Sequence, residues 1–381
     1  MAIQNLILLY GDIAFDSRVK RISSFIASQL GDTQLLSLKR FSERNYEFNK
    51  PNSLNHIEIK LISEKLPKNG KWGYLKYAEG FLRFFSYSIR AKLIYCNDLS
   101  TLPIAYFAKI FNTKIKIIYD SHEVAPYQGT PSKRKIRLKS LFERILIRKA
   151  DYVFTVSTRI SKWYRRVYRL QHVETIFNSP SFYPVARCKN FINEDSKIEF
   201  VWHGIFSPHR GIKETIRVFQ DTEVATKANV TFIGWGALKN DIKSFSNLFP
   251  NIKILDPVSQ NELINALQNF DCGLFTYEPI SKNYDWAMPN KLFEFTTAGI
   301  PVVSYPLSEA NYTITKYNIG YVANDFSSCS LKRSVLDFID SYEKNYEIFS
   351  QNTAKFINSH SWEKQKIKIS NALSQLKNIN E

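Results

Sequence analysis

Short apolar runs and amphipathic helical patterns alternate along almost the whole chain, and this alternation constrains the fold more than any other feature. Parallel strands need a long crossover connection, usually a helix, so this order of segments predicts parallel sheets built from β–α–β units. Strands are expected at residues 6–9, 34–38, 57–61, 93–95, 115–119, 152–156, 199–202, 230–233, 252–255, 273–275, 302–304 and 320–322. Helices are expected between them, notably at residues 17–30, with Asp16 as the N-cap, and at residues 102–111.

Two series of such units are separated by an irregular stretch at residues 177–196, which contains two prolines. A chain of 381 residues is long enough for about two domains. We predict an α/β fold with an N-terminal domain at residues 1–180 and a C-terminal domain at 181–361. The last helical pattern has no strand after it, so residues 362–381 are assigned to the N-terminal domain. Ligands of open α/β sheets bind outside the carboxyl ends of the strands, which predicts a site in a cleft between the domains.

The segment from Met288 to Gly299 is the most informative local pattern, because it reads as a helix that starts at a loop. Pro289 suits the first helical position, where no N–H is needed, and Gly299 suits the left-handed residue after the last turn. Free N–H groups and the positive dipole end favour an anion at such a helix start. Lys291 adds a full charge, and Glu294 lies about one and a half turns further on. The pattern suits a nucleotide diphosphate, but it also occurs in ordinary α/β packing.

A second cluster of candidate residues follows the first strand of the C-terminal half. Gly204 closes that strand, where a glycine lets a ligand approach the backbone. Arg210 precedes the next helix, and its planar guanidinium group can bind a diphosphate through two hydrogen bonds. Together with Lys291 it would neutralise a leaving nucleoside diphosphate without a metal. The chain contains no Asp-x-Asp metal-binding motif. On spacing alone, Arg210 is equally consistent with a surface arginine near a turn.

Polar residues also follow strands in the N-terminal half. His122 lies just past a strand and can hydrogen-bond to a sugar hydroxyl, and Asp98 is a similar case. The Gly11 loop leaves room for a ligand, while Asp16 and Arg18 open the next helix. A histidine beside acids is more often a structural hydrogen-bonding group, so that alternative stays open. Neither Gly-x-Gly-x-x-Gly nor a Walker loop occurs, which disfavours dehydrogenases and ATPases.

The net charge of +17 suggests an anionic partner. Residues 132–150 contain eight Lys or Arg and one acid, interleaved with apolar residues, which predicts a basic amphipathic helix. Such helices lie on anionic membrane surfaces. Residues 71–92 mix aromatic and basic side chains in a similar way. The alternative for both is a helix packed on a sheet with a solvated outer face. No zinc-finger, recognition-helix or RNP-like pattern supports nucleic acid as a partner.

No run of 18 apolar residues occurs, so no membrane-spanning helix is expected. The four cysteines are widely spaced, which predicts neither a disulfide framework nor a zinc site. We therefore expect a cytoplasmic protein attached peripherally to the inner face of the cell membrane.

Taken in order, the motifs of the chain resemble glycosyltransferase family 4, whose members are retaining enzymes of the GT-B architecture. The resemblance covers nearly the whole length. It implies two Rossmann-like domains facing each other across a cleft, with the C-terminal helix returning to the N-terminal domain. The matching pieces are Asp16-Ser17-Arg18-Val19 after the Gly11 loop, Asp120-Ser121-His122-Glu123, Phe177-Asn178, His203-Gly204 with Arg210-Gly211, Gly234-Trp235-Gly236, and Pro289-Asn290-Lys291 to Glu294.

The resemblance also implies an activity and residue roles. The enzyme would transfer a hexosyl or deoxyhexosyl group from a UDP- or GDP-linked sugar, without a metal or other cofactor. The acceptor would be a lipid-linked or glycan molecule in bacterial capsule, exopolysaccharide or O-antigen synthesis. The implied catalytic residues are His122, Arg210, Lys291 and Glu294, with Glu294 on the ribose, Arg210 and Lys291 on the diphosphate, and His122 near the reacting carbon. The implied donor site adds Gly204, Gly234, Pro289 and Asn290, and the acceptor site contains Gly11, Asp16, Arg18, Asp98 and His122.

Two positions depart from the family pattern. Most members carry two glutamates separated by seven residues, but Trp286 stands where the first is expected, with Asp285 beside it and Glu278 further off. Ile205 stands where the family usually has an arginine, directly after the strand-end glycine. Fewer cationic side chains therefore remain to bind the diphosphate. These departures motivate an alternative, a catalytically silent GT-B protein that serves as a binding or scaffolding subunit.

Overall fold

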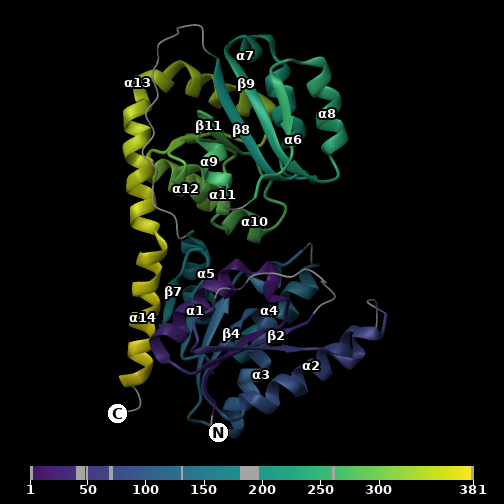
Figure 1. Ribbon diagram of the computed structural model, residues 1–381, viewed down its shortest axis with the longest axis vertical. Coiled ribbons are helices and arrows are strands. Elements are labelled where there is room, and N and C mark those ends of the chain that lie inside the picture. The colour runs from purple at the N-terminus through teal and green to yellow at the C-terminus, as the bar shows by residue number, and fades with distance from the viewer. Residues whose placement is uncertain are drawn as a thin grey trace. The chain divides into compact units, whose positions relative to one another are not determined.

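The computed structural model describes residues 3–39, 48, 50–67, 72–129, 132–180, 197–259 and 262–378 (Figure 1). The chain divides into two compact units, which are Met1–Ile176 with Lys366–Glu381, and Phe177–Gln365. We call them unit 1 and unit 2. The last helix, α14 (Trp362–Asn378), belongs to unit 1 from Lys366 onward. Its Lys368 Nζ donates a hydrogen bond to the carbonyl of Thr175 at 2.9 Å, so the predicted return of this helix is confirmed.

In the described part of unit 1, seven strands form one sheet in the order β3-β2-β1-β4-β5-β6-β7, and neighbouring strands are parallel. This is the strand order of doubly wound Rossmann folds, and it reverses between β1 and β4. The carboxyl ends of these two strands therefore form the switch point at which such sheets bind ligands. The strands are β1 (Ile3–Leu9), β2 (Thr33–Leu38), β3 (Leu54–Ile59), β4 (Ala91–Asn97), β5 (Lys116–Ser121), β6 (Tyr152–Thr155) and β7 (Val173–Thr175).

Five further helices surround this sheet in the described ranges. α1 starts as predicted, because the Asp16 side chain accepts a hydrogen bond from Val19 N at 2.9 Å. It ends at Gly31, which has a left-handed φ of 76°. Val19, Ile22 and Ile26 are buried at helical spacing. The helices are α1 (Ser17–Leu30), α2 (Trp72–Ser88), α3 (Asp98–Phe111), α4 (Lys133–Ile147) and α5 (Thr158–Tyr168).

Several elements of unit 1 differ from the prediction, and β1 and β4 each begin earlier than predicted, at Ile3 and Ala91. β3 begins at Leu54 rather than residue 57, because pairing with β2 sets its extent. α3 begins at Asp98, four residues earlier than predicted, and so its first turn lies at the sheet edge. The short strand β7 was not predicted. It pairs only with β6 among the described strands, and its three residues are too few to give an alternating pattern.

In the described part of unit 2, six strands form a parallel sheet in the order β10-β9-β8-β11-β12-β13. The order again reverses at the first strand, so the switch point lies between β8 and β11. The two parallel α/β sheets that the sequence predicted are thus confirmed. The strands are β8 (Ile198–Ile205), β9 (Ala228–Trp235), β10 (Ile252–Leu255), β11 (Cys272–Phe275), β12 (Val302–Ser304) and β13 (Gly320–Val322).

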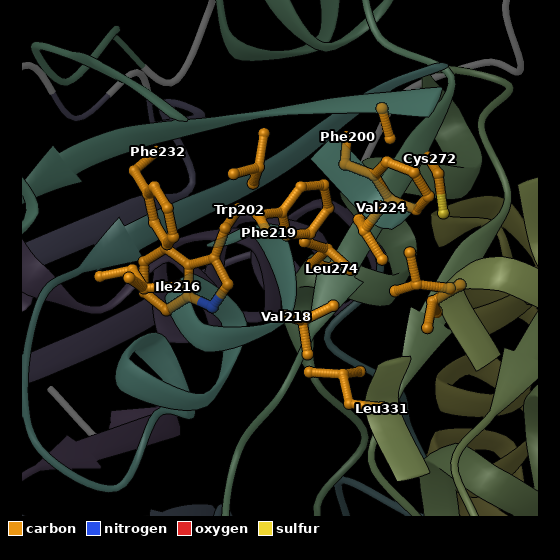
Figure 2. Packing of buried hydrophobic residues seen from close by; sticks show 14 of the residues in the cluster. Phe200, Trp202, Ile216, Val218, Phe219, Val224, Phe232, Cys272, Leu274 and Leu331 are labelled. Atoms are coloured by element: carbon orange, nitrogen blue, oxygen red, sulfur yellow. The ribbon is translucent and has the colours of Figure 1, made fainter. Parts of the chain in front are cut away.

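Alternate residues of β8 point to opposite faces of this sheet, as the period of a strand requires. Phe200 and Trp202 pack in one core with Phe219 of α6 (Figure 2). Val201 packs in the core of the other face, which also contains Leu292 of α11. The helices are α6 (Ile212–Gln220), α7 (Thr222–Lys227), α8 (Lys239–Leu248), α9 (Leu263–Leu267), α10 (Lys282–Trp286), α11 (Asn290–Thr297), α12 (Ser308–Tyr317) and α13 (Ser328–His360).

Within the ranges described, no helix combines the length and the apolar character needed to cross a membrane.

Candidate active site

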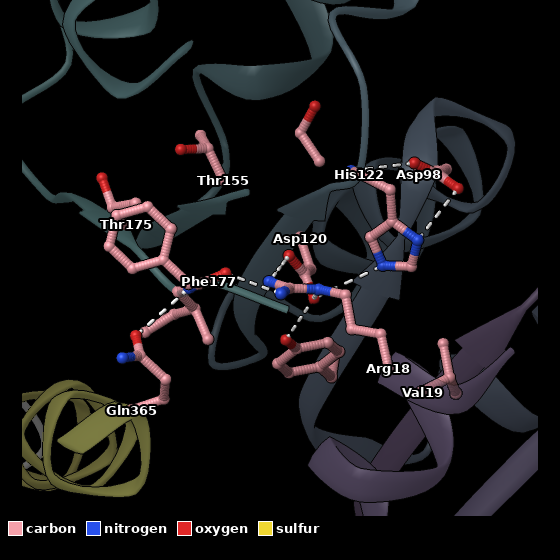
Figure 3. A network of polar contacts seen from close by, with 12 residues as sticks. Arg18, Val19, Asp98, Asp120, His122, Thr155, Thr175, Phe177 and Gln365 are labelled. Atoms are coloured by element: carbon pink, nitrogen blue, oxygen red, sulfur yellow. Dashed lines mark hydrogen bonds and ion pairs between the residues drawn. The ribbon is translucent and has the colours of Figure 1, made fainter. Parts of the chain in front are cut away.

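In unit 1, four of the predicted residues lie at the switch point of the sheet. The Nδ1 atom of His122 lies 3.6 Å from Asp98 Oδ2 and 3.8 Å from Asp16 Oδ2. Its Nε2 atom lies 3.5 Å from Oδ2 of Asp120, at the end of β5 (Figure 3). Three carboxylates therefore surround one imidazole. Gly11 follows β1 at the same edge, and its carbonyl accepts a hydrogen bond from Leu38 N at 2.9 Å.

The carboxylates determine the charge of His122. Burial alone lowers the pKa of this imidazole, but Asp98 and Asp120 outweigh burial and raise the pKa to about 9. The ring is therefore protonated at neutral pH, and both nitrogens act as hydrogen-bond donors. A buried imidazolium can donate to a hydroxyl group or to a phosphate oxygen.

Asp120 is held by the buried arginine Arg18. Arg18 donates from Nε to Asp120 Oδ2 at 3.0 Å and from Nη2 to Oδ1 at 2.7 Å, and its Nη1 donates to the Ile176 carbonyl at 2.6 Å. The hydroxyl of Tyr95 donates to Oδ2 at 2.7 Å. Burial would raise the pKa of Asp120, but Arg18 and then His122 hold it well below its usual range. Arg18 therefore positions Asp120, the carboxylate that faces His122. The predicted contact of Arg18 with an acceptor stays a prediction.

The backbone at Asp98 is unusual. Its φ is 62°, which costs a non-glycine residue about 1–3 kcal/mol. The left-handed turn places Asp98 Oδ1 3.1 Å from the backbone N–H of His122, which donates to it. Strained residues of this kind cluster at functional sites. Gly11 shows no such requirement, because an added Cβ there would be in ordinary contact with Leu9 at 3.6 Å.

In unit 2, Lys291 lies buried at the start of α11. Its Nζ atom is 3.8 Å from the centre of the Trp202 ring and 5.2 Å from that of Tyr277. Among the described residues, no hydrogen-bond partner contacts this nitrogen. Gly204 makes room for it, since an added Cβ would lie 2.8 Å from Nζ and the φ of Gly204 is 124°. Burial holds the pKa of Lys291 well below its usual range, although Glu294 opposes the shift.

Glu294 lies beside His203. The His203 Nε2 atom is 3.4 Å from Glu294 Oε2, and both side chains are largely buried. Burial, with Lys291 adding to it, lowers the pKa of His203 well below its usual range, so this imidazole is neutral. His203 belongs to the motif quoted above but was not predicted as a site residue. Its position directly before the strand-end glycine is the signal that identifies it.

Arg210 is fixed in the loop between β8 and α6. Its Nε donates to Ser207 Oγ at 3.0 Å, and its Nη1 donates to the Tyr277 hydroxyl. The guanidinium carbon lies 4.5 Å from the centre of the Tyr277 ring. Tyr277 therefore lies within cation–π distance of both Arg210 and Lys291. It has no motif in the sequence, and only the fold brings it to these cations.

Three other predicted donor residues have distinct positions. Pro289 lies just before α11 rather than in its first turn, because the helix begins at Asn290. The Asn290 Oδ1 atom accepts a hydrogen bond from Asn178 Nδ2 at 3.2 Å. Gly234 has a φ of 154°, and an added Cβ would lie 1.9 Å from the carbonyl oxygen of Gly204. Gly234 is therefore needed for the close approach of β8 and β9, and its contact with a donor stays a prediction.

The acids near the expected first glutamate have other partners. Asp285 accepts hydrogen bonds from the backbone N–H and the hydroxyl of Ser308, both at 2.8 Å, at the start of α12. Trp286 packs under Lys282, whose Nζ is 4.9 Å from the ring centre. Glu278 pairs with His209 Nδ1 at 2.9 Å. Asp285 therefore stabilises the start of α12. It does not replace the first glutamate of the family pattern.

Ile205, which stands in place of the family arginine, is 42% exposed.

In the described part of the chain, no group of three or more His, Cys, Asp or Glu side chains has an arrangement suited to a metal ion.

Comparison with solved structures defines the class of the fold. Sucrose-phosphate synthase from Thermosynechococcus elongatus is 14% identical, with a TM-score of 0.76 over 99% of this chain and 100% of that chain. The apo form of the lipopolysaccharide outer core galactosyltransferase WaaB is 15% identical, with a TM-score of 0.71 over 98% and 99%. Anabaena HepE in complex with UDP is 14% identical, with a TM-score of 0.68 over 98% and 100%. The two Rossmann-ordered units thus have the GT-B fold.

Family models define the group within this class. The model "Glycosyl transferase 4-like domain" matches residues 44–178, and the model "Glycosyl transferases group 1" matches residues 186–356. Together they account for most of the chain, which belongs to the group 1 glycosyltransferases. The resemblance seen in the sequence is therefore confirmed. No curated protein sequence matches the chain.

Proposed function

We propose that the protein is a retaining glycosyltransferase that transfers a sugar from a nucleoside diphosphate to a lipid-linked or glycan acceptor. The observation that carries this proposal is the environment of Lys291. Among the described residues, the buried ammonium of Lys291 has no hydrogen-bond partner, which is costly, and an anionic ligand would remove that cost. Lys291 is the second residue of α11, and the helix dipole also favours an anion at the start of this helix.

The donor is proposed to bind in unit 2. Lys291 and Arg210 contact the diphosphate, and Tyr277 holds Arg210 in place through its hydroxyl. Glu294 accepts hydrogen bonds from the ribose hydroxyls, with His203 beside it. Two cations and a helix start supply the positive charge, which supports a reaction without a metal. Anabaena HepE contains UDP or UDP-glucose in its structures, which supports a uridine nucleotide as the first donor to test.

The chemistry depends on charge stabilisation more than on a covalent nucleophile. Positive groups at the departing diphosphate lower the barrier, because they act where negative charge develops. Retention follows if the acceptor attacks on the face that the leaving group vacates. His122, as a buried imidazolium in unit 1, donates a hydrogen bond to the donor sugar near its reacting carbon. No residue is assigned as a covalent nucleophile.

A role in bacterial surface-polysaccharide synthesis is part of the proposal. WaaB, a structural neighbour, is a lipopolysaccharide outer core galactosyltransferase. The basic segments of the sequence favour an acceptor at the inner face of the cell membrane. The competing proposal is a catalytically silent subunit, which Trp286 and Ile205 motivate because both replace charged family residues.

A thermal-shift screen tests the donor site. The purified chain is heated with UDP, GDP and their sugar derivatives. Binding to the folded state alone adds about 2.7 kcal/mol at a hundredfold excess of ligand over Kd. We expect a shift with one diphosphate that Glu294→Ala removes and that Glu347→Ala, a change at an exposed position on α13, retains.

Activity is then measured as release of the free nucleoside diphosphate. Release that Glu294→Ala abolishes excludes the silent subunit. A thermal shift without any release, in the presence of extracted lipid-linked acceptors, supports the silent subunit. Absence of a shift with every nucleotide would refute the donor site itself.

A further inference from the structure

Helix α4 exposes an apolar stripe. Leu138, Leu141, Phe142 and Ile145 recur at the spacing of one helical face. Leu138 is 59% exposed, Leu141 57%, Phe142 50% and Ile145 49%. A helix that packs against a sheet normally turns such a stripe towards the core. The stripe therefore needs an explanation other than folding of unit 1.

The inward face of α4 is fixed by Glu143, the acid of this helix. Glu143 is fully buried and accepts hydrogen bonds from three tyrosine hydroxyls. The distances are 2.8 Å from Tyr119 of β5, and 2.6 Å and 2.7 Å from Tyr164 and Tyr168 of α5. Turning the helix about its axis would break these bonds and leave a buried carboxylate without donors, which is costly. The exposure of the stripe is thus built into the packing of unit 1.

The same helix carries a dense set of cations. All of its basic residues, with the two that follow its end, are exposed. Each cation near an anionic lipid surface contributes on the order of 1 kcal/mol. The residues are Lys133, Arg134, Lys135, Arg137, Lys139, Arg144, Arg148 and Lys149.

Neighbouring helices add exposed apolar surface. α3 contacts both α2 and α4. On α3, Phe107 is 44% exposed, Ile110 50% and Phe111 70%, again at helical spacing. Phe107 and Phe111 make edge-to-face contacts with aromatic rings of α2, with centroids 5.9 Å from Phe81 and 5.8 Å from Phe85. The apolar surface is therefore not confined to one helix.

An apolar stripe between cations distinguishes among the possible partners. Nucleic acid would use the cations but would leave the leucines and the phenylalanine in water. A bilayer interface uses both, because apolar side chains enter the acyl boundary while Lys and Arg stay at the phosphate level.

We propose that α4 is an in-plane membrane helix, and that its stripe of Leu138, Leu141, Phe142 and Ile145 docks unit 1 on an anionic lipid bilayer. The docking itself does not depend on the donor site. It rests on the proposed function only in implying that the acceptor is presented at a lipid surface.

Vesicle sedimentation with the full chain tests this proposal. Vesicles of phosphatidylcholine with phosphatidylglycerol are compared with vesicles of phosphatidylcholine alone. We expect binding to the anionic vesicles that weakens as salt rises. Leu141→Ser with Phe142→Ser should reduce the binding about tenfold or more, because two apolar side chains no longer enter the lipid. The matched control is Leu248→Ser with Tyr312→Ser, which removes exposed apolar side chains of unit 2 and should leave binding unchanged.

Three results would overturn the proposal. The first is no binding of the unaltered chain to anionic vesicles at low salt. The second is equal binding of the Leu141→Ser, Phe142→Ser variant, which would mean general attraction to polyanions. The third is a dimer that this variant converts to a monomer, which would assign the stripe to a second copy of the chain.

The nucleotide-dependent thermal shift is measured on the same samples. Vesicle binding without that shift would leave the docking proposal intact and refute only the donor site.

Discussion

The Nζ atom of Lys291 lies 3.8 Å above the centre of the Trp202 ring. The face of the indole ring attracts this buried ammonium, but it substitutes only partly for water. Lys291 and Trp202 come from α11 and β8, which border the switch point of unit 2. A bound anion would therefore stabilise the buried ammonium of Lys291.

Replacing Lys291 by methionine should separate stability from binding. Methionine has a similar length and no charge, so the change removes the cost of burying an ammonium. We expect Lys291→Met to raise the unfolding free energy of the unliganded protein at neutral pH by on the order of 1–2 kcal/mol. Because the folded-state pKa of Lys291 is lowered, this gain should shrink as pH approaches 10.5, its ordinary value. The nucleotide-dependent shift should disappear. Urea unfolding and the thermal-shift screen measure the two effects, and a variant that is less stable yet still binds would contradict this interpretation.

Gly204→Ala should displace the lysine nitrogen. The new Cβ would lie 2.8 Å from Nζ, and alanine would have to adopt a φ of 124°. We expect a loss of stability of about 1–3 kcal/mol from backbone strain and a weakening of nucleotide binding of about tenfold or more. Gly31→Ala is the control, since Gly31 has a φ of 76° with no atom within 4 Å of an added Cβ. It should lose stability without losing affinity, and equal affinity in the two variants would show that Gly204 serves only the backbone.

Asp120→Asn should remove the carboxylate that pairs directly with the buried guanidinium of Arg18. Removing one partner of a buried ion pair costs about 3–5 kcal/mol, which equilibrium unfolding in urea can measure. Lys239→Ala is the comparison, because its pair with Asp256 is exposed and its loss should not be measurable. A small effect of Asp120→Asn would mean that water or another carboxylate reaches Arg18.

His122 should make stability depend on alkaline pH. Its pKa is raised from 6.5 to about 9 in the folded state, so the folded state holds the proton more tightly than the unfolded state. The stabilisation is complete below about pH 6.5 and is lost as pH rises through about 9. The shift corresponds to on the order of 3 kcal/mol. The measurement compares urea unfolding of the unaltered chain and His122→Gln at pH 6 and pH 9. The difference between the two proteins should be large at pH 6 and small at pH 9, and a difference that does not change with pH would exclude a raised pKa.

Much of the fold was accessible from the sequence. The range predicted for α1, residues 17–30, and those for β12 and β13 agree with the structure. These segments have a clear periodicity, a capping residue or a bounding glycine, all of which are local signals. β3 and α3 were displaced because strand pairing and the sheet edge, rather than neighbouring residues, decide where they begin.

The candidate site was accessible only in part. The order of motifs indicated Lys291, Glu294, Arg210 and His122 as candidates, because each lies in a short segment with a recognisable pattern. Tyr277 carries no motif of its own, and its contacts arise from the fold.

The sequence by itself determined the alternation that makes two parallel sheets, the helix start at Asn290 to within one residue, and the basic character of α4. Only the tertiary structure decided which face of α4 is exposed, because Glu143 meets tyrosines of two other elements. It also decided that Arg18 pairs with Asp120, 102 residues away, and that Gly204 gives room to Lys291. Local periodicity depends on neighbours along the chain, whereas these pairings depend on which strand ends the folded sheet brings together.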